Sequence, residues 1–218
     1  VPPVLELPFD PVRPPVQRYR GAWANRQFSP KLSERLRALA AERGCTLFMV
    51  LLAAFYVLIA RYTGREDLVV GTPVAGRKRS ELEDLVGFFL NTLVLRADLA
   101  GNPSFIKLLG RVQETTLEAY DHQELPFEKL VEKLQPDRNL SHAPIFQVLF
   151  VLNHMSREDV KFGDLEIGSA LYDISTAKFD LQLTVSEVTD GLATTILYNT
   201  DLFEEGTVDR MLGHYSML

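Results

Sequence analysis

The stretch Val86-Gly-Phe-Phe-Leu-Asn-Thr-Leu-Val-Leu-Arg96 predicts a buried strand that begins with two polar side chains. Its second half is aliphatic and β-branched. Gly87 precedes that half and Asp98-Leu-Ala-Gly101 follows it, which is typical of a short strand. The strand begins with Asn91 and Thr92, at the edge of an apolar core. Because such groups are costly to bury without partners, we expect both side chains to make defined contacts.

Helices and strands alternate in the first half of the chain, and strands cluster in the second half. Helices are expected where a Ser or Thr precedes a periodic apolar run, as at Ser29, Thr46 and Ser104. The dipeptide Asp190-Gly191 predicts a hairpin turn. The predicted helices span 29–43, 46–62, 102–121, 125–134 and 204–218, and the predicted strands span 18–28, 67–74, 91–96, 145–152, 165–172, 179–188 and 193–198. This order predicts an α/β fold with a mixed β-sheet flanked by helices.

Residues 1–17, called the N-terminal segment below, are rich in proline. Prolines forbid a regular helix and favour an extended conformation. By composition alone this segment is linker-like. Its apolar residues Val4, Leu5, Leu7 and Phe9 indicate instead that it packs along a surface.

Composition excludes several classes of partner. The chain has 218 residues, a net charge of −6 and no basic run, which argues against nucleic acid because phosphate binding requires clustered Lys and Arg. The single cysteine, Cys45, excludes an internal disulfide and a cysteine-based metal site, and indicates a cytoplasmic location. The longest apolar run, 47–60, is shorter than the ~20 residues of a membrane span, so we expect a buried helix and no membrane partner.

The sequence contains no motif for a self-contained catalytic site. Gly71-Thr-Pro-Val-Ala-Gly76 lacks the Lys and Ser/Thr of a P-loop, and no Gly-x-Ser-x-Gly elbow is present. The histidines are not spaced for a shared metal site; they are His122, His142, His154 and His214. We therefore expect no catalytic residue and no metal site in this chain.

Three ordered segments carry the clearest functional signal: 86–96, His122-Gln-Glu-Leu-Pro-Phe-Glu128 and Arg138-Asn-Leu-Ser-His-Ala-Pro-Ile-Phe-Gln147. They resemble the fifth, sixth and seventh core motifs of the condensation domains of nonribosomal peptide synthetases. Flanking segments agree: Leu7-Pro-Phe-Asp10 with Arg13-Pro14, Gly71-Thr-Pro-Val-Ala-Gly-Arg77, Ser175-Thr-Ala-Lys-Phe-Asp180 and Tyr198-Asn-Thr-Asp-Leu-Phe203. The resemblance covers essentially the whole chain and implies a lobe with a chloramphenicol acetyltransferase-like fold.

Condensation domains have two such lobes, and their catalytic His-His-x-x-x-Asp-Gly motif lies in the N-terminal lobe. That motif is absent from this sequence. The resemblance therefore implies that residues 1–218 are the C-terminal lobe, cut at both ends from a longer polypeptide and inactive alone.

The family forms amide bonds between carrier-bound acyl or peptidyl thioesters and carrier-bound aminoacyl thioesters, in bacterial antibiotic and other secondary-metabolite biosynthesis. The implied partners are the missing N-terminal lobe, carrier domains and a neighbouring adenylation domain. The substrates are carried on phosphopantetheine arms, and the chain itself is expected to bind no cofactor directly.

The resemblance also implies roles for residues between the two lobes. Arg77 is expected to pair with the aspartate of the missing motif; the alternative is a solvated arginine. Asn91 and Thr92 either face a substrate tunnel or tie the strand end to a neighbouring loop, and the second interpretation is preferred.

Further interlobe candidates lie in the sixth and seventh motifs. His122 and Gln123 are expected to anchor the segment between two helices. Ser141 and His142 either contact the phosphopantetheine arm or belong to a loop that caps the next strand. Arg138 is also an interlobe candidate. The seventh motif usually begins Arg-Asp, but here Asn139 follows Arg138, which removes a local ion pair.

Two other functional classes fit the same motifs. One is a lobe of an epimerisation or heterocyclisation domain, and heterocyclisation domains carry an Asp-rich motif in the missing lobe. The other is a non-catalytic docking platform for carrier or adenylation domains. The forms Val-Gly-Phe-Phe-x-Asn-Thr and His-Gln-x-x-Pro-Phe-Glu favour ordinary condensation over the first class.

Overall fold

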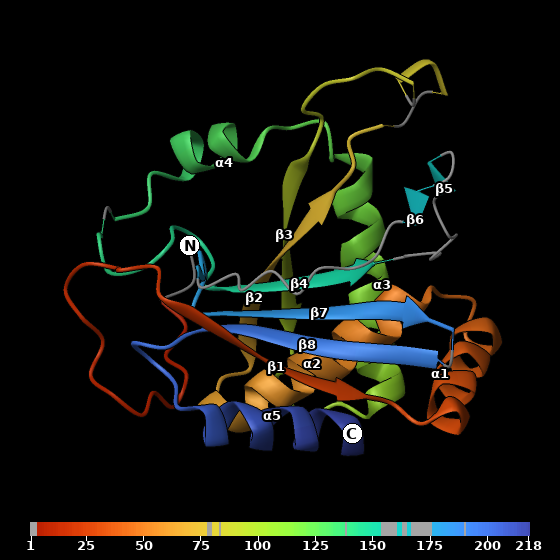
Figure 1. The fold of residues 1–218 in the computed structure, drawn as a ribbon, viewed down its shortest axis with the longest axis horizontal. Coiled ribbons are helices and arrows are strands. Elements are labelled where there is room, and N and C mark those ends of the chain that lie inside the picture. The colour runs from red at the N-terminus through yellow and green to blue at the C-terminus, as the bar shows by residue number, and fades with distance from the viewer. Residues whose placement is uncertain are drawn as a thin grey trace.

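A computed structural model describes residues 4–77, 80–82, 84–137, 139–153, 161–162, 165–166, 176–189 and 191–218. Within these ranges the helices are α1 Pro30–Glu42, α2 Leu47–Thr63, α3 Phe105–Asp121, α4 Phe127–Leu134 and α5 Glu205–Met217, with a short 3₁₀ turn at Ser80–Leu82 (Figure 1). The strands are β1 Gly21–Gln27, β2 Asp67–Val74, β3 Asn91–Asp98, β4 Val148–Asn153, β5 Lys161–Phe162, β6 Leu165–Glu166, β7 Leu181–Val188 and β8 Gly191–Asn199.

Six of the described strands form one mixed sheet, in the order β1-β8-β7-β4-β2-β3. Strand β4 runs parallel to β2 and β7, and the remaining neighbours are antiparallel. The strand expected from the opening stretch is β3, which pairs with β2 from Asn91 opposite Val74 to Asp98 opposite Asp67. The predicted α/β fold with a mixed sheet is therefore confirmed.

The predicted helix caps are also confirmed. The side chains of Ser29, Thr46 and Ser104 accept hydrogen bonds from the backbone amide three residues later, as helix N-caps do. Helix α2 is apolar on nearly all sides and most of its middle is buried, with Ala54 and Val57 only partly buried. Among the described residues no single helix is long and apolar enough to cross a membrane, although α1 and α2 meet the length and composition test as a pair bent by 108°.

The two faces of the sheet are covered differently. Helices α1, α2, α3 and α5 contribute to the main apolar core on one face, whereas α4 stands apart from them (Figure 1). Helix α4 packs through Phe127, Leu130 and Val131 against a second cluster that contains Val69 and Phe146. This arrangement leaves α4 attached to the body mainly through that cluster and its own N-terminus.

Gly71 of β2 makes the second cluster possible. A Cβ atom at this position would lie 2.2 Å from Cε2 of Phe146, far inside van der Waals contact. The Phe146 ring also packs against the rings of Phe127 and Phe179, at centroid distances of 5.5 and 5.3 Å. The glycine of the Gly-Thr-Pro motif is therefore required for close ring-to-backbone packing.

Three strand predictions differ from the structure. The strand expected at 18–28 begins only at Gly21, because Tyr19 has a φ of +58°. The strand expected at 145–152 begins only at Val148, because Ile145 has a φ of +68° and the Phe146 amide donates to the Pro144 carbonyl. Of the strand expected at 165–172, only β6 is described; it pairs with β5 in a separate two-stranded sheet. Residues 167–172 lie outside the described residues.

The described part of the N-terminal segment contains no helix or strand and packs against the body. Leu5 and Leu7 are buried in the main core. The Asp10 carboxylate accepts hydrogen bonds from the Glu204 amide and the Thr207 hydroxyl, both at 2.9 Å. Because Glu204, the N-cap residue of α5, makes no side-chain cap bond itself, Asp10 supplies the cap from the other end of the chain.

Candidate functional site

Asn91 ties the start of β3 to the connection between α3 and α4. Its side-chain amide donates to the carbonyls of Gln123 and Leu125, at 2.8 and 2.7 Å. Its Oδ1 accepts from the amides of Thr92 and Phe127, at 2.8 and 3.1 Å. Phe127 is the first residue of α4, so Asn91 satisfies an unpaired helical N–H that no residue of α4 caps.

Thr92 and Gln123 line a hollow of about 870 Å³ beside Asn91. Phe88, Phe89 and Lys178 are among its other lining residues. Gln123 donates through Nε2 to the Tyr120 carbonyl at 2.9 Å and so closes the C-terminal turn of α3. We call this cavity the Asn91 hollow.

His122 and Arg77 lie at the margin of this region. The His122 amide donates to the Ala119 carbonyl, and the residue is exposed. The Arg77 guanidinium donates to the carbonyls of Leu82 and Leu85 and lies 4.3 Å above the centroid of the Phe89 ring. Arg77 thus binds backbone carbonyls five and eight residues after itself. Its pairing with an aspartate of another lobe stays a prediction.

Residues 139–144, called the His142 loop below, form a second group. The Ser141 amide donates to Asn139 Oδ1 at 2.8 Å, so the asparagine that replaces the usual aspartate of the motif closes a turn. The ring of His142 makes a 3.1 Å contact through Nδ1 with the Ala143 carbonyl. Arg138, the remaining candidate of this motif, lies outside the described residues.

His142 lies where three hollows meet. Together with Asn139 it lines hollows of about 820, 490 and 650 Å³. The first of these shares Glu128 with the Asn91 hollow, and the last shares Lys178 with it. Candidates from each of the three motifs therefore line adjoining cavities: Asn91, Thr92, Gln123, Ser141 and His142. His122 is not among the lining residues of these four hollows.

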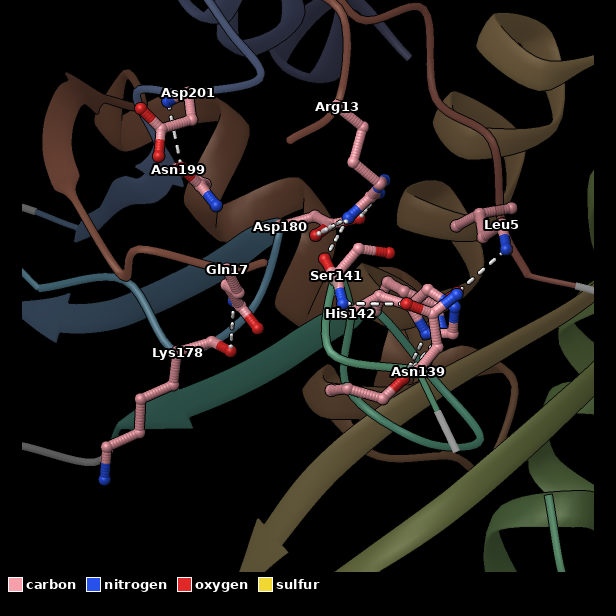
Figure 2. Close-up of polar contacts among 12 residues, drawn as sticks. Leu5, Arg13, Gln17, Asn139, Ser141, His142, Lys178, Asp180, Asn199 and Asp201 are labelled. Atoms are coloured by element: carbon pink, nitrogen blue, oxygen red, sulfur yellow. Dashed lines mark hydrogen bonds and ion pairs between the residues drawn. The ribbon is translucent and has the colours of Figure 1, made fainter. Parts of the chain in front are cut away.

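Sequence reasoning missed the ion pair that holds the His142 loop in place. Arg13 of the N-terminal segment binds both carboxylate oxygens of Asp180, at the start of β7, and donates to the Ser141 carbonyl (Figure 2). Asp180 is 1% exposed and Arg13 17%. Both residues stand in segments that resemble family motifs, but no pattern in a single sequence pairs positions so far apart.

Two buried aspartates differ in their electrostatics. Burial raises the pKa of the Asp180 carboxyl above its ordinary value, and Arg13 and His142 only partly oppose this effect. Burial acts in the same direction on Asp201, but hydrogen bonds from both Arg18 and Arg20 outweigh it and hold the pKa of that carboxyl below its ordinary value. Asp180 therefore depends on Arg13, its single arginine partner among the described residues.

The described residues contain no group of three or more His, Cys, Asp or Glu side chains placed to hold a metal ion. They offer hydrogen-bonding and apolar walls around open cavities. Such walls can orient a bound group and exclude water from it.

A family model for the condensation domain matches residues 2–218. The chain belongs to the condensation domain family. It is 45% identical over 216 residues to tyrocidine synthase 3 of Brevibacillus parabrevis, an alignment that covers 99% of this chain and 3% of that protein. The chain therefore spans only a small part of the curated relative that it matches.

Solved structures agree with this condensation domain assignment. The chain is similar to the X-domain in its complex with OxyB from teicoplanin biosynthesis, with a TM-score of 0.89, 27% identity, and coverage of 100% of this chain and 49% of the matched chain. It is also similar to a four-domain nonribosomal peptide synthetase bound to AMP and glycine, with a TM-score of 0.86, 26% identity, and coverage of 98% of this chain and 17% of that one.

Proposed function

We propose that this chain is the C-terminal lobe of a condensation domain that forms amide bonds between carrier-bound acyl or peptidyl and aminoacyl thioesters. The observation that carries this proposal is the set of adjoining hollows lined by residues of three condensation motifs, in a chain that belongs to the family. Because the sequence contains no His-His-x-x-x-Asp-Gly motif, we infer that the chain contributes a wall of the tunnel and no catalytic group.

In this proposal the hollows receive the phosphopantetheine arms that carry the two substrates. Ser141 and His142 contact an arm where the hollows meet, and Thr92 and Gln123 line the adjoining part. Holding the amine and the thioester in contact and away from water is the contribution that such a wall makes. The proposed partners are an N-terminal lobe, carrier domains and an adenylation domain.

Arg77 has a distinct role in this proposal. Its loop carries Val86 and Phe88, which are almost fully exposed, so the loop offers apolar surface that a second lobe would cover. The Arg77 guanidinium would then pair with the aspartate of the second lobe's motif and hold the catalytic loop of that lobe in place.

The test is an amide-transfer assay with two loaded carriers, in which the carrier-bound dipeptide is detected by mass spectrometry. The synthetase that contains this chain is expected to form the dipeptide. The isolated chain is expected to give no product above the background without protein. Turnover by the isolated chain would show that it has its own catalytic group and would overturn the proposal.

A second candidate function is a non-catalytic docking platform. The observation that favours it is the similarity to an X-domain whose structure was solved in complex with OxyB. The two candidates differ in one result: a platform binds a carrier or another protein, yet a synthetase containing it forms no amide at this step. A carrier titration followed by NMR, run beside the transfer assay, separates them.

A further inference from the structure

Arg13 joins three parts of the fold that are distant in sequence. It comes from the N-terminal segment, binds Asp180 at the start of β7 and donates from Nη1 to the Ser141 carbonyl at 3.0 Å (Figure 2). Its guanidinium carbon also lies 4.6 Å from the centroid of the Phe9 ring. A planar guanidinium with several donors can make these contacts together, whereas a single ammonium group cannot.

Other contacts from the N-terminal segment reach the same loop. The backbone amide of Gln17 donates to the Leu140 carbonyl at 2.8 Å. The backbone amide of Leu5 donates to Gln147 Oε1 at 2.8 Å, and Gln147 Nε2 donates to the Ala143 carbonyl at 3.1 Å. Together with the bond from Arg13, these contacts hold the carbonyls on both sides of His142.

The backbone that follows the His142 loop is held in an unfavourable conformation. Ile145 has a φ of +68°, a value that β-branched residues rarely adopt. Such a conformation persists only where the surrounding structure imposes it. The N-terminal segment contributes to that constraint indirectly: Gln147 Nε2 holds the Ala143 carbonyl, two residues before Ile145, and Gln147 Oε1 accepts from the Leu5 amide.

We propose that Arg13 is a positioning residue for the condensation reaction: it acts through Ser141 and Asp180 to hold the His142 loop where the three hollows meet. This inference rests on the proposed function. Arg13 lies in the wall of one hollow, but its donors are directed at protein acceptors, so its effect on substrate is exerted through the loop. The N-terminal segment thereby sets the shape of the tunnel wall.

The substitution Arg13→Lys separates positioning from simple anchoring. A lysine keeps a positive charge for the buried Asp180 carboxylate but cannot also reach the Ser141 carbonyl in the same geometry. Arg18→Lys is the matched control, because it makes the same change in another arginine–aspartate pair. Asp201 keeps its second partner, Arg20, in that control.

Both variants are made in the synthetase that contains this chain. Hydrogen exchange followed by mass spectrometry measures protection of the His142 loop, and steady-state kinetics measures kcat and KM for the carrier-bound aminoacyl substrate per folded enzyme. Arg13→Lys is expected to speed exchange of the loop and to lower kcat/KM at least about tenfold, since small misplacements are costly in catalysis. Arg18→Lys is expected to leave both quantities close to those of the wild type.

Unchanged loop exchange in Arg13→Lys overturns the inference, and so does faster exchange with unchanged kcat/KM. If Arg13→Lys does not fold, Asp180→Asn replaces it, because this change weakens the hold on Arg13 while preserving side-chain volume. A wild-type synthetase that forms no amide contradicts the proposed function instead. In that case the exchange measurement alone decides whether Arg13 holds the loop.

Discussion

Replacing Asn91 with alanine tests whether this residue fastens α4 to the sheet. The wild-type side chain makes four hydrogen bonds, of which one, to the Thr92 amide, joins adjacent residues and contributes little to tertiary structure. The other three join β3 to the α3–α4 connection and to the first amide of α4. At about 1 kcal/mol for each bond, Asn91→Ala is expected to lower the free energy of unfolding by about 3 kcal/mol.

Urea denaturation measures that loss, and hydrogen exchange locates it. Amides of α4 are expected to exchange faster, whereas those of the β7–β8 hairpin do not. Asn91→Asp keeps the acceptor oxygen but places a carboxylate oxygen against the carbonyls of Gln123 and Leu125. At neutral pH it is therefore expected to destabilise the fold at least as much as Asn91→Ala. Asn25→Ala is the matched control, because Asn25 lies in β1 and its side chain makes an exposed bond to Thr195. A loss no larger than the control's, with α4 still protected, would refute the reasoning.

Three further predictions concern core packing, helix stability and acid stability. Gly71→Ala is expected to destabilise the fold by about 2 kcal/mol in urea denaturation, because the ring of Phe146 cannot move away from the new methyl group. Gly110→Ala is expected to stabilise α3 by about 0.5–1 kcal/mol in the same assay, because the space around Gly110 is open. The pKa of Asp201 lies below its ordinary 3.8 in the folded chain, so its stabilising effect is present above that pH and is lost as pH falls through the folded value. Asp201→Asn is therefore expected to lower stability at pH 7 and to flatten its decline below about pH 4, and an unchanged acid transition would contradict this.

Local patterns allowed much of the fold to be predicted. The caps of α1, α2 and α3 were readable because Ser29, Thr46 and Ser104 act within one turn of their own position. The strand predicted at 91–96 followed from its composition and its flanking turn residues, and β3 extends two residues further, to Asp98. Its polar start was expected to have partners, and the structure places the partners of Asn91 in the α3–α4 connection.

What the sequence did not reveal depends on contacts between distant segments. The start of β4 was placed too early, because Ile145 and Phe146 have strand-forming side chains but tertiary packing imposes a different backbone. The pairing of Arg13 with Asp180 could not be predicted either, because it joins residues that are far apart in the sequence. Proline content indicated that the N-terminal segment forms no regular helix, but the residues to which it binds could be found only in the folded chain.

Complementation in trans tests the central claim most directly. The chain is mixed with the separately produced N-terminal lobe of the same condensation domain, and dipeptide formation between loaded carriers is measured as each component is titrated. If this chain supplies a tunnel wall and the other lobe supplies the histidine, product is expected only when both are present and is expected to saturate at an equal ratio. Product from this chain alone, or full activity of the other lobe without it, would contradict the account.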